Sequence, residues 1–334
     1  METKKNNVKT LVNETLRIII RVALYLYFGG IVVRGKNNIP RDKPLIVVAN
    51  HQNALLDALL VATQLGLTPY FLTRFDVFKI PVVARMLRYL QLLPVYRMRD
   101  GIEHIPKNEE TFEQCTHLLS NGAALLIFPE GNHSLERKLR PISKGFTRIA
   151  FRTLEQQPDL PLQVLPVGLN YAAHQFGGTK VWLHIGRALA VKESGFDAPL
   201  LKSRVKDALN DLISETSVVD DSLPINQSVY PINTKPANTP MYKSTIKEPI
   251  IQTRTIVHVI FFPLVLIWLL LKPLIKDPVF YGTFKFLIGL VGVPLYLASV
   301  CLGTWIAVQP FIGLIISSLM LFALFLFRYS PYQN

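Results

Sequence analysis

Apolar and polar positions are distributed unevenly along this chain of 334 residues. Residues 286–327 contain no charged side chain, and at ~1.5 Å per helical residue they would extend about twice the ~30 Å thickness of a bilayer core. Gln309-Pro310 falls in the middle of this run, and proline is a natural turn point. The pattern predicts two membrane-spanning helices, at roughly 286–308 and 311–327.

A shorter uncharged segment, residues 255–271, precedes this run and is interrupted by Pro263. Its length is marginal for a span, so it could cross the membrane, re-enter it or lie in its interface. The positive-inside rule places flanking basic residues on the cytoplasmic side, and the long run is flanked by Lys272, Lys276, Lys285 and Arg328. A two-helix hairpin satisfies this rule for all four residues, whereas three crossings would separate the lysines from the arginine. We therefore favour the hairpin, with 255–271 not crossing.

The first 29 residues contain three lysines and then an apolar stretch that carries Glu14, Arg17 and Arg21. A cleaved signal peptide needs an uninterrupted apolar core and a small-residue cleavage site, and neither is evident. Charges at helical spacing instead predict that residues 1–29 form an amphipathic helix lying on the membrane. The alternative is a helix buried against the domain that follows.

Between residues 30 and 218, short apolar runs alternate with segments of helical periodicity. The runs typical of buried strands are 45–49, 123–128, 163–167 and 181–185. The helical segments are 54–65, 111–120 and 198–217. This alternation predicts an α/β domain, a layered sheet with flanking helices. A polar stretch rich in Pro and Asn, 219–254, is expected to link it to the membrane segment, 255–328, which we expect to be an anchor without chemistry.

Composition narrows the classes of function. The chain has 36 Lys+Arg against 23 Asp+Glu, a net charge of +13, and half of its residues are hydrophobic. The apolar content excludes a disordered chain, and only two cysteines exclude a disulfide-rich scaffold. The sequence has no metal-site spacing and no nucleic-acid-binding motif. An apolar and basic chain indicates a membrane-attached protein that handles anionic groups, with neither a metal nor a nucleic acid as partner.

The most promising residue for chemistry is a histidine at the end of a predicted strand. His51 follows the strand 45–49, and Asp57 lies near the start of the next predicted helix. Strand ends that lead into helices are where α/β proteins present functional groups. The two side chains can meet only if His51 bends back from its loop, and the carboxylate would then make it a general base. A capping loop with an incidental histidine is the alternative.

Two further clusters contain residues that can bind a phosphate. Pro129-Glu130-Gly131 follows the strand 123–128, and Lys144 comes shortly after it. Glycine permits close backbone approach, and lysine meets a phosphate as a point charge. Arg97 suits bidentate phosphate recognition. A polar turn is the alternative for the first cluster.

Residues 74–93 interleave basic and bulky apolar side chains, which suits an anionic membrane surface.

Taken in order, these clusters resemble the glycerolipid acyltransferase family, which contains the lysophosphatidic acid and glycerol-3-phosphate acyltransferases. Asn50-His51 with Asp57 resembles the family's Asn-His-x4-Asp block, and Phe128-Pro129-Glu130-Gly131 matches its PEG block. Pro94-Val95-Tyr96-Arg97 looks like the arginine block between them. Two later matches are Leu165-Pro166-Val167, which is similar to the final block, and Lys144-Gly145. The resemblance covers roughly residues 30–215.

The chain departs from the family pattern at two places. Five residues separate His51 from Asp57 instead of four, as in some glycerol-3-phosphate and dihydroxyacetone phosphate acyltransferases, which leaves the acceptor open. Asn132-His133-Ser134 replaces the commoner Thr-Arg-Ser and removes a possible phosphate-binding arginine. Arg137 or Arg140 could substitute for it.

The resemblance implies a role for each matched residue. His51 would take a proton from a hydroxyl of a glycerol phosphate acceptor, whose oxygen would attack the thioester of an acyl-CoA or acyl carrier protein. Asp57 would orient His51, and no cofactor beyond this acyl donor would be needed. The acceptor phosphate site would comprise Arg97, Lys144, Gly131 and Glu130, the last ordering its block. Supporting positions would be Asn50, Pro129 and Pro166.

We therefore expect a membrane-bound 1-acylglycerol-3-phosphate acyltransferase that makes phosphatidic acid for phospholipid synthesis, with its catalytic domain on the cytoplasmic face. A glycerol-3-phosphate or dihydroxyacetone phosphate acyltransferase is the nearest alternative. A non-catalytic, lipid-binding membrane scaffold is an alternative of another class. A transporter is disfavoured because the apolar run has few spans and no intramembrane charge.

Overall fold

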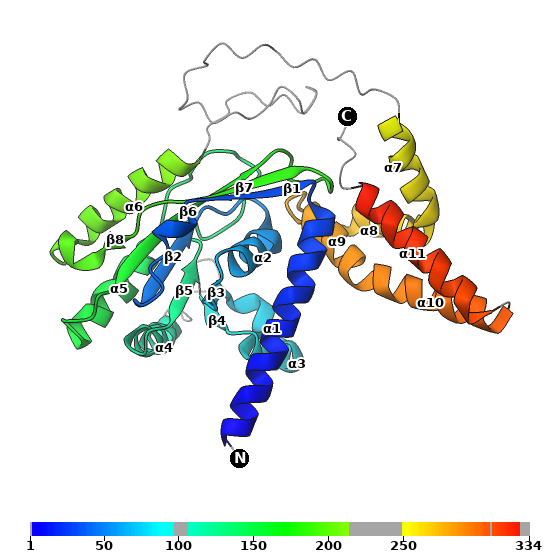
Figure 1. Ribbon diagram of the computed structural model, residues 1–334. Coiled ribbons are helices and arrows are strands. Elements are labelled where there is room, and N and C mark those ends of the chain that lie inside the picture. Colours follow the sequence, from blue (N-terminus) through cyan, green and yellow to red (C-terminus); the bar gives the residue numbers. More distant parts are fainter. Residues whose placement is uncertain (1, 97–105, 214–248, 308, 328–334) are drawn as a thin grey trace, which may run out of the picture.

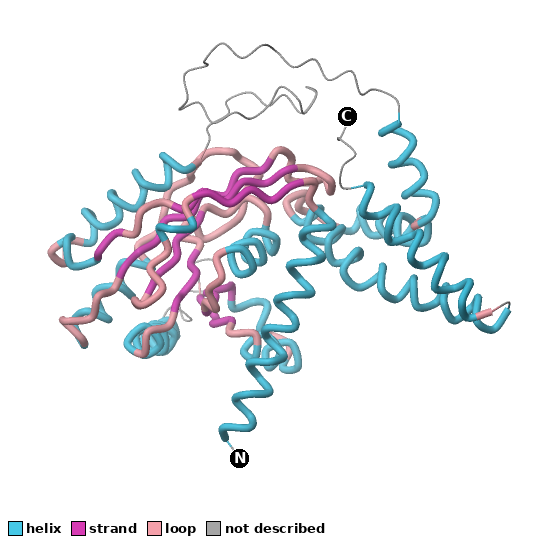
Figure 2. The backbone as a smooth tube through the Cα atoms, viewed as in Figure 1, coloured by secondary structure: helices cyan, strands magenta, loops and turns pink. Residues whose placement is uncertain are grey.

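The computed structural model describes residues 2–96, 106–213, 249–307 and 309–327. Its N-terminal domain, the described part of residues 2–213, is built on one sheet, and residues 249–327 form the C-terminal helices beside it (Figure 1). Strands gather in the middle of the N-terminal domain and helices flank them (Figure 2). The predicted α/β fold, a layered sheet with flanking helices, is confirmed.

The strands are β1 (Gly30–Arg34), β2 (Leu45–Ala49), β3 (Tyr70–Arg74), β4 (Leu92–Val95), β5 (Ala124–Ile127), β6 (Gln163–Tyr171), β7 (Lys180–Ile185) and β8 (Leu189–Ala190). The helices of the N-terminal domain are α1 (Glu2–Tyr27), α2 (Ala54–Gln64), α3 (Pro81–Tyr89), α4 (Asn108–Ser120), α5 (Gly145–Gln156) and α6 (Ala198–Leu212). The C-terminal helices are α7 (Pro249–Ile260), α8 (Phe262–Leu271), α9 (Phe280–Leu287), α10 (Val293–Ala307) and α11 (Pro310–Phe327). The four predicted strands correspond to β2, β5, β6 and β7, and the three predicted helices to α2, α4 and α6.

The strands form a mixed sheet in the order β1-β7-β6-β2-β5-β3-β4, with the short β8 paired to β6. β2 lies parallel to both β5 and β6, and Val48 is level with Ile127 on one side and Pro166 on the other. Parallel strands bring the residues that follow them to the same edge of a sheet. The loops after β2 and β5 therefore lie side by side.

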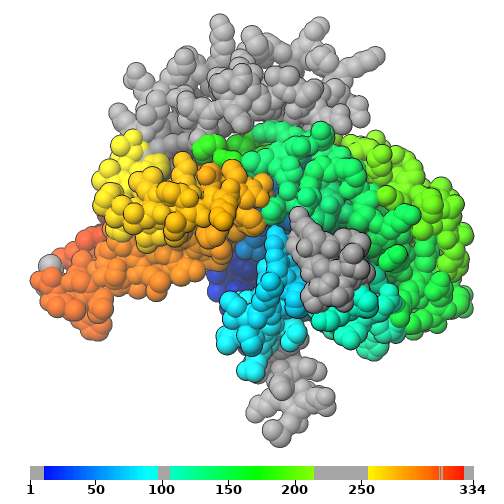
Figure 3. Space-filling model, turned by 180° about the vertical axis from the view of Figure 1, so that it is seen from behind, coloured from blue at the N-terminus to red at the C-terminus, as the bar shows by residue number. Residues whose placement is uncertain are grey.

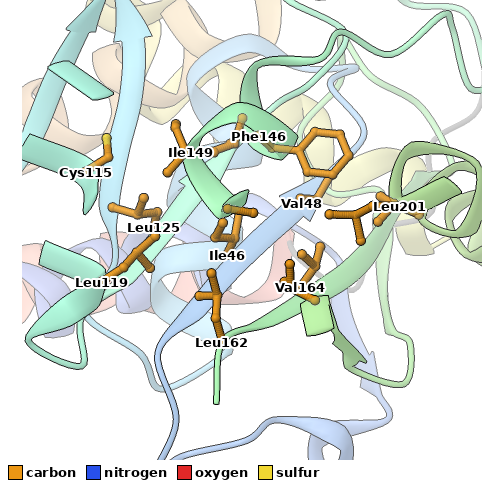
Figure 4. Packing of buried hydrophobic residues seen from close by; sticks show 14 of the residues in the cluster. Ile46, Val48, Cys115, Leu119, Leu125, Phe146, Ile149, Leu162, Val164 and Leu201 are labelled. Atoms are coloured by element: carbon orange, nitrogen blue, oxygen red, sulfur yellow. The ribbon is translucent and has the colours of Figure 1, made fainter. Parts of the chain in front are cut away.

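Alternate residues of β2 enter two hydrophobic cores. Ile46 and Val48 pack with α4, α5 and α6 in a first core (Figure 4). Leu45 and Val47 pack with α1 and α2 in a second core on the opposite face. Every residue of β2 is buried, as is typical of a strand covered on both faces. The loop that follows β2 therefore starts from a fixed point.

Helix α1 packs against the domain that follows it, as in the alternative expected for the N-terminus. Leu24 and Phe28, near its end, are fully buried in the second core, and the guanidinium of Arg21 donates to the carbonyl of Thr63. The boundary predicted at residue 29 therefore does not separate this helix from the domain. Its opposite face nevertheless exposes apolar side chains, among them Leu11, Ile18, Val22 and Tyr25.

The C-terminal helices contain the long apolar run. α9 passes through a π-helical turn, Ile288–Gly292, into α10, and the continuous helix Phe280–Ala307 is long and apolar enough to cross a membrane. It begins before the predicted start at residue 286, and α11 begins at Pro310, where the turn was predicted. α11 packs against α10 and α7 and is a shorter apolar helix. α7 and α8 are separated at Phe261, and neither alone reaches the length of a span.

The C-terminal helices pack directly against the N-terminal domain. From behind, the orange helices lie against its green and cyan surface (Figure 3). Phe286 of α9 is buried in the second core. α9, which lies within the predicted membrane segment 255–328, therefore contributes to the core of the N-terminal domain. Of the predicted linker, 219–254, the part up to residue 248 lies outside the described residues, and α7 begins within the rest.

Neighbouring leucines on α6 test the assignment of its buried face. Leu201 is fully buried in the first core, whereas Leu200 is 44% exposed. We expect Leu201→Ala to lower the free energy of unfolding by about 2–5 kcal/mol, because it leaves a cavity, and Leu200→Ala to change it by less than about 0.5 kcal/mol. Denaturant unfolding of the two variants measures the difference. Equal losses in the free energy of unfolding would contradict the burial of Leu201 on the inner face of α6.

Candidate active site

His51 meets Asp57 at the end of β2. The histidine lies in the loop between β2 and α2, and its Nδ1 atom is 2.8 Å from Oδ2 of Asp57 on the first turn of α2. The Asp57 side chain is fully buried, while that of His51 is 18% exposed. The histidine thus bends back from its loop, as the predicted pairing required. Because a carboxylate accepts hydrogen bonds, Nδ1 carries the proton and Nε2 is left able to accept one.

The Asp57 carboxylate also fixes the backbone of the His51 loop, residues 50–53. Its Oδ2 atom accepts hydrogen bonds from the backbone N–H groups of Gln52 and Asn53, each at 2.7 Å. Its Oδ1 atom accepts a hydrogen bond from the hydroxyl of Tyr171. Burial and the nearby carboxylate raise the pKa of Tyr171 well above its ordinary value, so the phenol remains a donor. Asp57 therefore positions both the histidine and its loop.

A second buried pair supports the loop from the other side. Asn53 stands at the N-cap position of α2, but its side chain donates to the carbonyl of His174 at 2.9 Å instead of capping the helix. The Nε2 atom of His174 is 3.0 Å from Oε1 of Gln52. Burial lowers the pKa of His174 to about 4, so the ring is neutral at neutral pH. Since an amide oxygen only accepts, the neutral ring donates to Gln52.

Glu130 contacts the His51 loop directly. Its Oε1 atom accepts the backbone N–H of His51 at 2.9 Å, and its Oε2 atom pairs with Nε of Arg140 at 2.5 Å. Arg140 also donates to the carbonyl of His51 at 3.3 Å. Burial raises the pKa of Glu130, although both contacts favour its charged form. The expected role of Glu130 in ordering its block fits these contacts, but its assignment to the phosphate site does not, because a carboxylate repels a phosphate.

Aromatic rings surround the imidazole of His51. The ring of Phe128 stacks on it at a centroid distance of 4.1 Å, and the ring of His133 lies 5.8 Å away. Burial lowers the pKa of His133 to about 4. Gly131, between them in sequence, has a φ of 71°, a left-handed conformation that favours glycine, and space beside it is open.

The candidate phosphate-binding residues are only partly brought together. Arg97 lies outside the described residues. Lys144 is exposed at the N-cap of α5, next to Ser143, whose N–H donates to the carbonyl of Pro129 at 2.7 Å. The start of α5 is thereby held beside the turn that contains Gly131. Arg137 instead donates to the carbonyl of Ala172 at 2.8 Å.

The supporting positions lie behind the site. The buried side chain of Asn50 makes two hydrogen bonds with Leu169, from Nδ2 to its carbonyl at 2.9 Å and to Oδ1 from its N–H at 2.7 Å. This bridge ties the end of β2 to β6. Pro166 lies in β6 level with Val48, and its carbonyl accepts the N–H of Gly186. Asn50 therefore fixes the strand that presents His51, and Pro166 belongs to the neighbouring strand that supports it.

Sequence reasoning missed three residues of this site. Tyr171 ends an apolar strand, and no local pattern distinguishes it from a core residue. His174 lacks any acidic neighbour in sequence, and Arg140 was considered only as a replacement phosphate ligand. Their roles arise from contacts between distant segments. Among the described residues, no group of three His, Cys, Asp or Glu side chains is arranged to hold a metal ion.

Comparison with known proteins shows which family this domain resembles. Residues 30–169 match the family model described as Acyltransferase. The chloroplastic 1-acyl-sn-glycerol-3-phosphate acyltransferase BAT2 of Brassica napus is 29% identical over 138 residues, which cover 41% of this chain and 37% of that protein. The 1-acyl-sn-glycerol-3-phosphate acyltransferase of Borreliella burgdorferi is 25% identical over 202 residues, covering 58% of this chain and 76% of that protein.

A solved structure also matches. The 1-acyl-sn-glycerophosphate acyltransferase PlsC from Thermotoga maritima has 27% sequence identity and a TM-score of 0.48, covering 62% of this chain and 80% of its own. The chain spans only about a third of the length of the plant relatives. The family match includes β2, the His51 loop and the turn after β5. Residues 30–169 of this chain are therefore similar to the acyltransferase family, and the relatives named above are 1-acyl-sn-glycerol-3-phosphate acyltransferases.

Proposed function

We propose that this protein transfers a fatty acyl group from acyl-CoA or acyl carrier protein to the free hydroxyl of 1-acyl-sn-glycerol 3-phosphate, which yields phosphatidic acid. The observation that carries this proposal is the 2.8 Å contact between His51 Nδ1 and the buried Asp57 carboxylate, within a domain that matches the acyltransferase family. The names of several relatives support the choice of acceptor.

The reaction follows from the tautomer that Asp57 holds. Nε2 of His51 takes the proton of the acceptor hydroxyl while the hydroxyl oxygen attacks the thioester carbonyl carbon. The carbon–sulfur bond then breaks, the new ester bond remains, and His51 returns the proton to the departing thiolate. Asp57 stabilises the imidazolium in between. The proposed reaction steps require no metal and form no acyl-enzyme.

The acceptor phosphate would bind on the side of the PEG turn. Lys144 supplies a point charge at the start of α5, and the open space beside Gly131 permits close approach of the acceptor to the backbone. Arg97 is proposed as a further phosphate ligand from its place in the sequence. Glu130 and Arg140 would position His51 and would not bind the phosphate themselves.

A glycerol-3-phosphate or dihydroxyacetone phosphate acyltransferase is the second candidate. The five residues between His51 and Asp57 favour it, because some enzymes of that kind share this spacing. The same base, acyl donor and phosphate site would serve both reactions. A non-catalytic lipid-binding scaffold is a third candidate, which the complete His51–Asp57 pair disfavours.

The protein would be an integral membrane protein with its catalytic domain on the cytoplasmic face. The continuous helix leaves the domain after α9, and from Ile288 to Ala307 it has about 20 residues, or ~30 Å, none of them buried in the α10 part. α11 would return as the second arm of a hairpin. The exposed apolar residues of α1 would lie in the membrane surface, as would Ile80 at the N-cap of α3 and Val82 and Met86 within it.

Replacement of the proposed base tests the chemistry. We expect His51→Ala to reduce the rate of acceptor-dependent thiol release by about 10²-fold to 10⁴-fold, because the general base is lost. His117→Ala, the same change at an exposed histidine on α4, should leave turnover unchanged. Thiol release by purified protein in lipid vesicles measures both. Full turnover in His51→Ala would refute the assignment.

Glu130 offers a test of positioning. In Glu130→Gln the amide oxygen can still accept the His51 N–H, but the ion pair with Arg140 is lost. We expect kcat to fall about 10-fold to 100-fold from the displaced loop, with little change in KM for the acceptor. Glu113→Gln removes an exposed ion pair with Arg152 and should have no effect. An unchanged kcat in Glu130→Gln would rule out this positioning role.

Cysteine labelling tests the hairpin. Lys276 and Gln309 are both exposed, and they stand before and after the continuous helix. In a background with Cys115→Ser and Cys301→Ser, we expect Lys276→Cys and Gln309→Cys to react with an impermeant maleimide from opposite sides of sealed, oriented vesicles. Lys276→Cys should share the side of the catalytic domain. Labelling of both cysteines from one side would contradict a span between them.

A further inference from the structure

Helix α9 packs tightly against the His51 loop at Gly282. A Cβ atom at Gly282 would lie 2.7 Å from the carbonyl oxygen of His174 and 2.9 Å from Oδ1 of Asn53. Both distances are shorter than real Cβ contacts, so a side chain at this position requires α9 to move relative to both groups. Asn53 belongs to the His51 loop, and its N–H is bound by the Asp57 carboxylate.

Hydrogen bonds hold α9 in this place. The hydroxyl of Tyr27 donates to the carbonyl of Gly282 at 3.2 Å, and Nζ of Lys285 donates to the carbonyl of Gln175 at 2.9 Å. Gln175 follows His174, which in turn binds Gln52 and Asn53. α9, the segment after β6 and the His51 loop are therefore joined in one polar network.

Apolar contacts extend the docking to the imidazole itself. Phe286 is almost fully buried, and its ring meets that of Tyr27 edge-on at 5.6 Å. At the start of α9, the ring of Phe280 meets His133 edge-on at 4.7 Å, and His133 lies 5.8 Å from His51. Two ring contacts thus connect α9 with the proposed base.

We propose that α9 is a positioning element of the active site, so that the membrane-embedded C-terminal segment holds the His51 loop in its reactive conformation. This inference rests on the proposed function of His51. α9 lies outside residues 30–169, the part that matches the family, and it continues without a break into the proposed membrane span. The His51 loop is therefore fixed on one side by Asp57 and on the other by a helix anchored in the bilayer.

The physical consequence is a coupling between docking and catalysis. The backbone N–H groups of the His51 loop point to Asp57 and Glu130, and their geometry sets the direction of the imidazole. A shift of about 1 Å in such a group can cost about 10²-fold in rate. Displacement of α9 should therefore lower kcat more than it changes acceptor binding.

Matched glycine substitutions test this proposal. Gly282 and Gly289 lie on the same continuous helix, and a Cβ at Gly289 meets nothing within 4 Å. Alanine is a better helix former than glycine at both positions. A loss of kcat that is confined to Gly282→Ala must therefore come from the docking contact. We expect Gly282→Ala to lower kcat at least about 10-fold with KM for the acceptor within about 3-fold. Gly289→Ala should behave like the parent.

Hydrogen exchange provides a readout that does not depend on turnover. In the full-length protein in vesicles, we expect amide exchange in residues 50–57 to be faster in Gly282→Ala than in the parent or in Gly289→Ala, while the exchange of α6 is unchanged. Phe280→Ala should have the same local effect, and Phe284→Ala, an exposed position on α9, should not. The thermal midpoint of the N-terminal domain is measured in parallel.

The outcomes separate this proposal from the proposed function. Unchanged exchange in residues 50–57 would overturn the positioning role, whatever the activity. A uniform rise in exchange with a lower thermal midpoint would also overturn it, since α9 would then only add stability. If the parent protein shows no turnover, the proposed function fails, while faster local exchange in Gly282→Ala and Phe280→Ala still supports control of the loop by α9.

Discussion

The site depends on the burial of one carboxylate. Asp57 is fully shielded from solvent, and a buried charge is tolerated only when its hydrogen-bonding capacity is filled. Four donors fill it: Nδ1 of His51, the N–H groups of Gln52 and Asn53, and the hydroxyl of Tyr171. The need to satisfy Asp57 therefore determines the course of the loop, the tautomer of the histidine and the position of the strand end that carries Tyr171.

The surrounding structure can be understood as support for this arrangement. β2 is buried on both faces, Asn50 ties its end to β6, and the Glu130–Arg140 pair holds the backbone of His51 from the neighbouring strand. α9 closes the remaining side. A catalytic loop that is held from several elements loses less entropy when it orders around a substrate, which favours reaction over binding alone.

Much of this arrangement could be predicted from the sequence. Buried strands such as β2 and β5 are short runs of apolar residues, and the residues at their ends stand out because polar groups follow at once. His51, Asp57 and the PEG turn were found in this way. β1, β3, β4 and β8 were missed because most of their residues are only half-buried, so these strands lack the complete burial of β2. Tyr171, His174 and Gly282 contribute through contacts across more than a hundred residues, for which a single sequence carries no signal.

The most direct test of the proposed acyl transfer is the choice of acceptor by the parent protein. Thiol release from acyl-CoA and from acyl carrier protein is measured in lipid vesicles with 1-acyl-sn-glycerol 3-phosphate, glycerol 3-phosphate or dihydroxyacetone phosphate as acceptor. We expect thiol release that depends on the acceptor and is fastest with 1-acyl-sn-glycerol 3-phosphate, together with formation of phosphatidic acid. Faster thiol release with one of the two water-soluble acceptors would instead favour a glycerol-3-phosphate or dihydroxyacetone phosphate acyltransferase. No acceptor-dependent release with any of the three would contradict an acyltransferase built around His51.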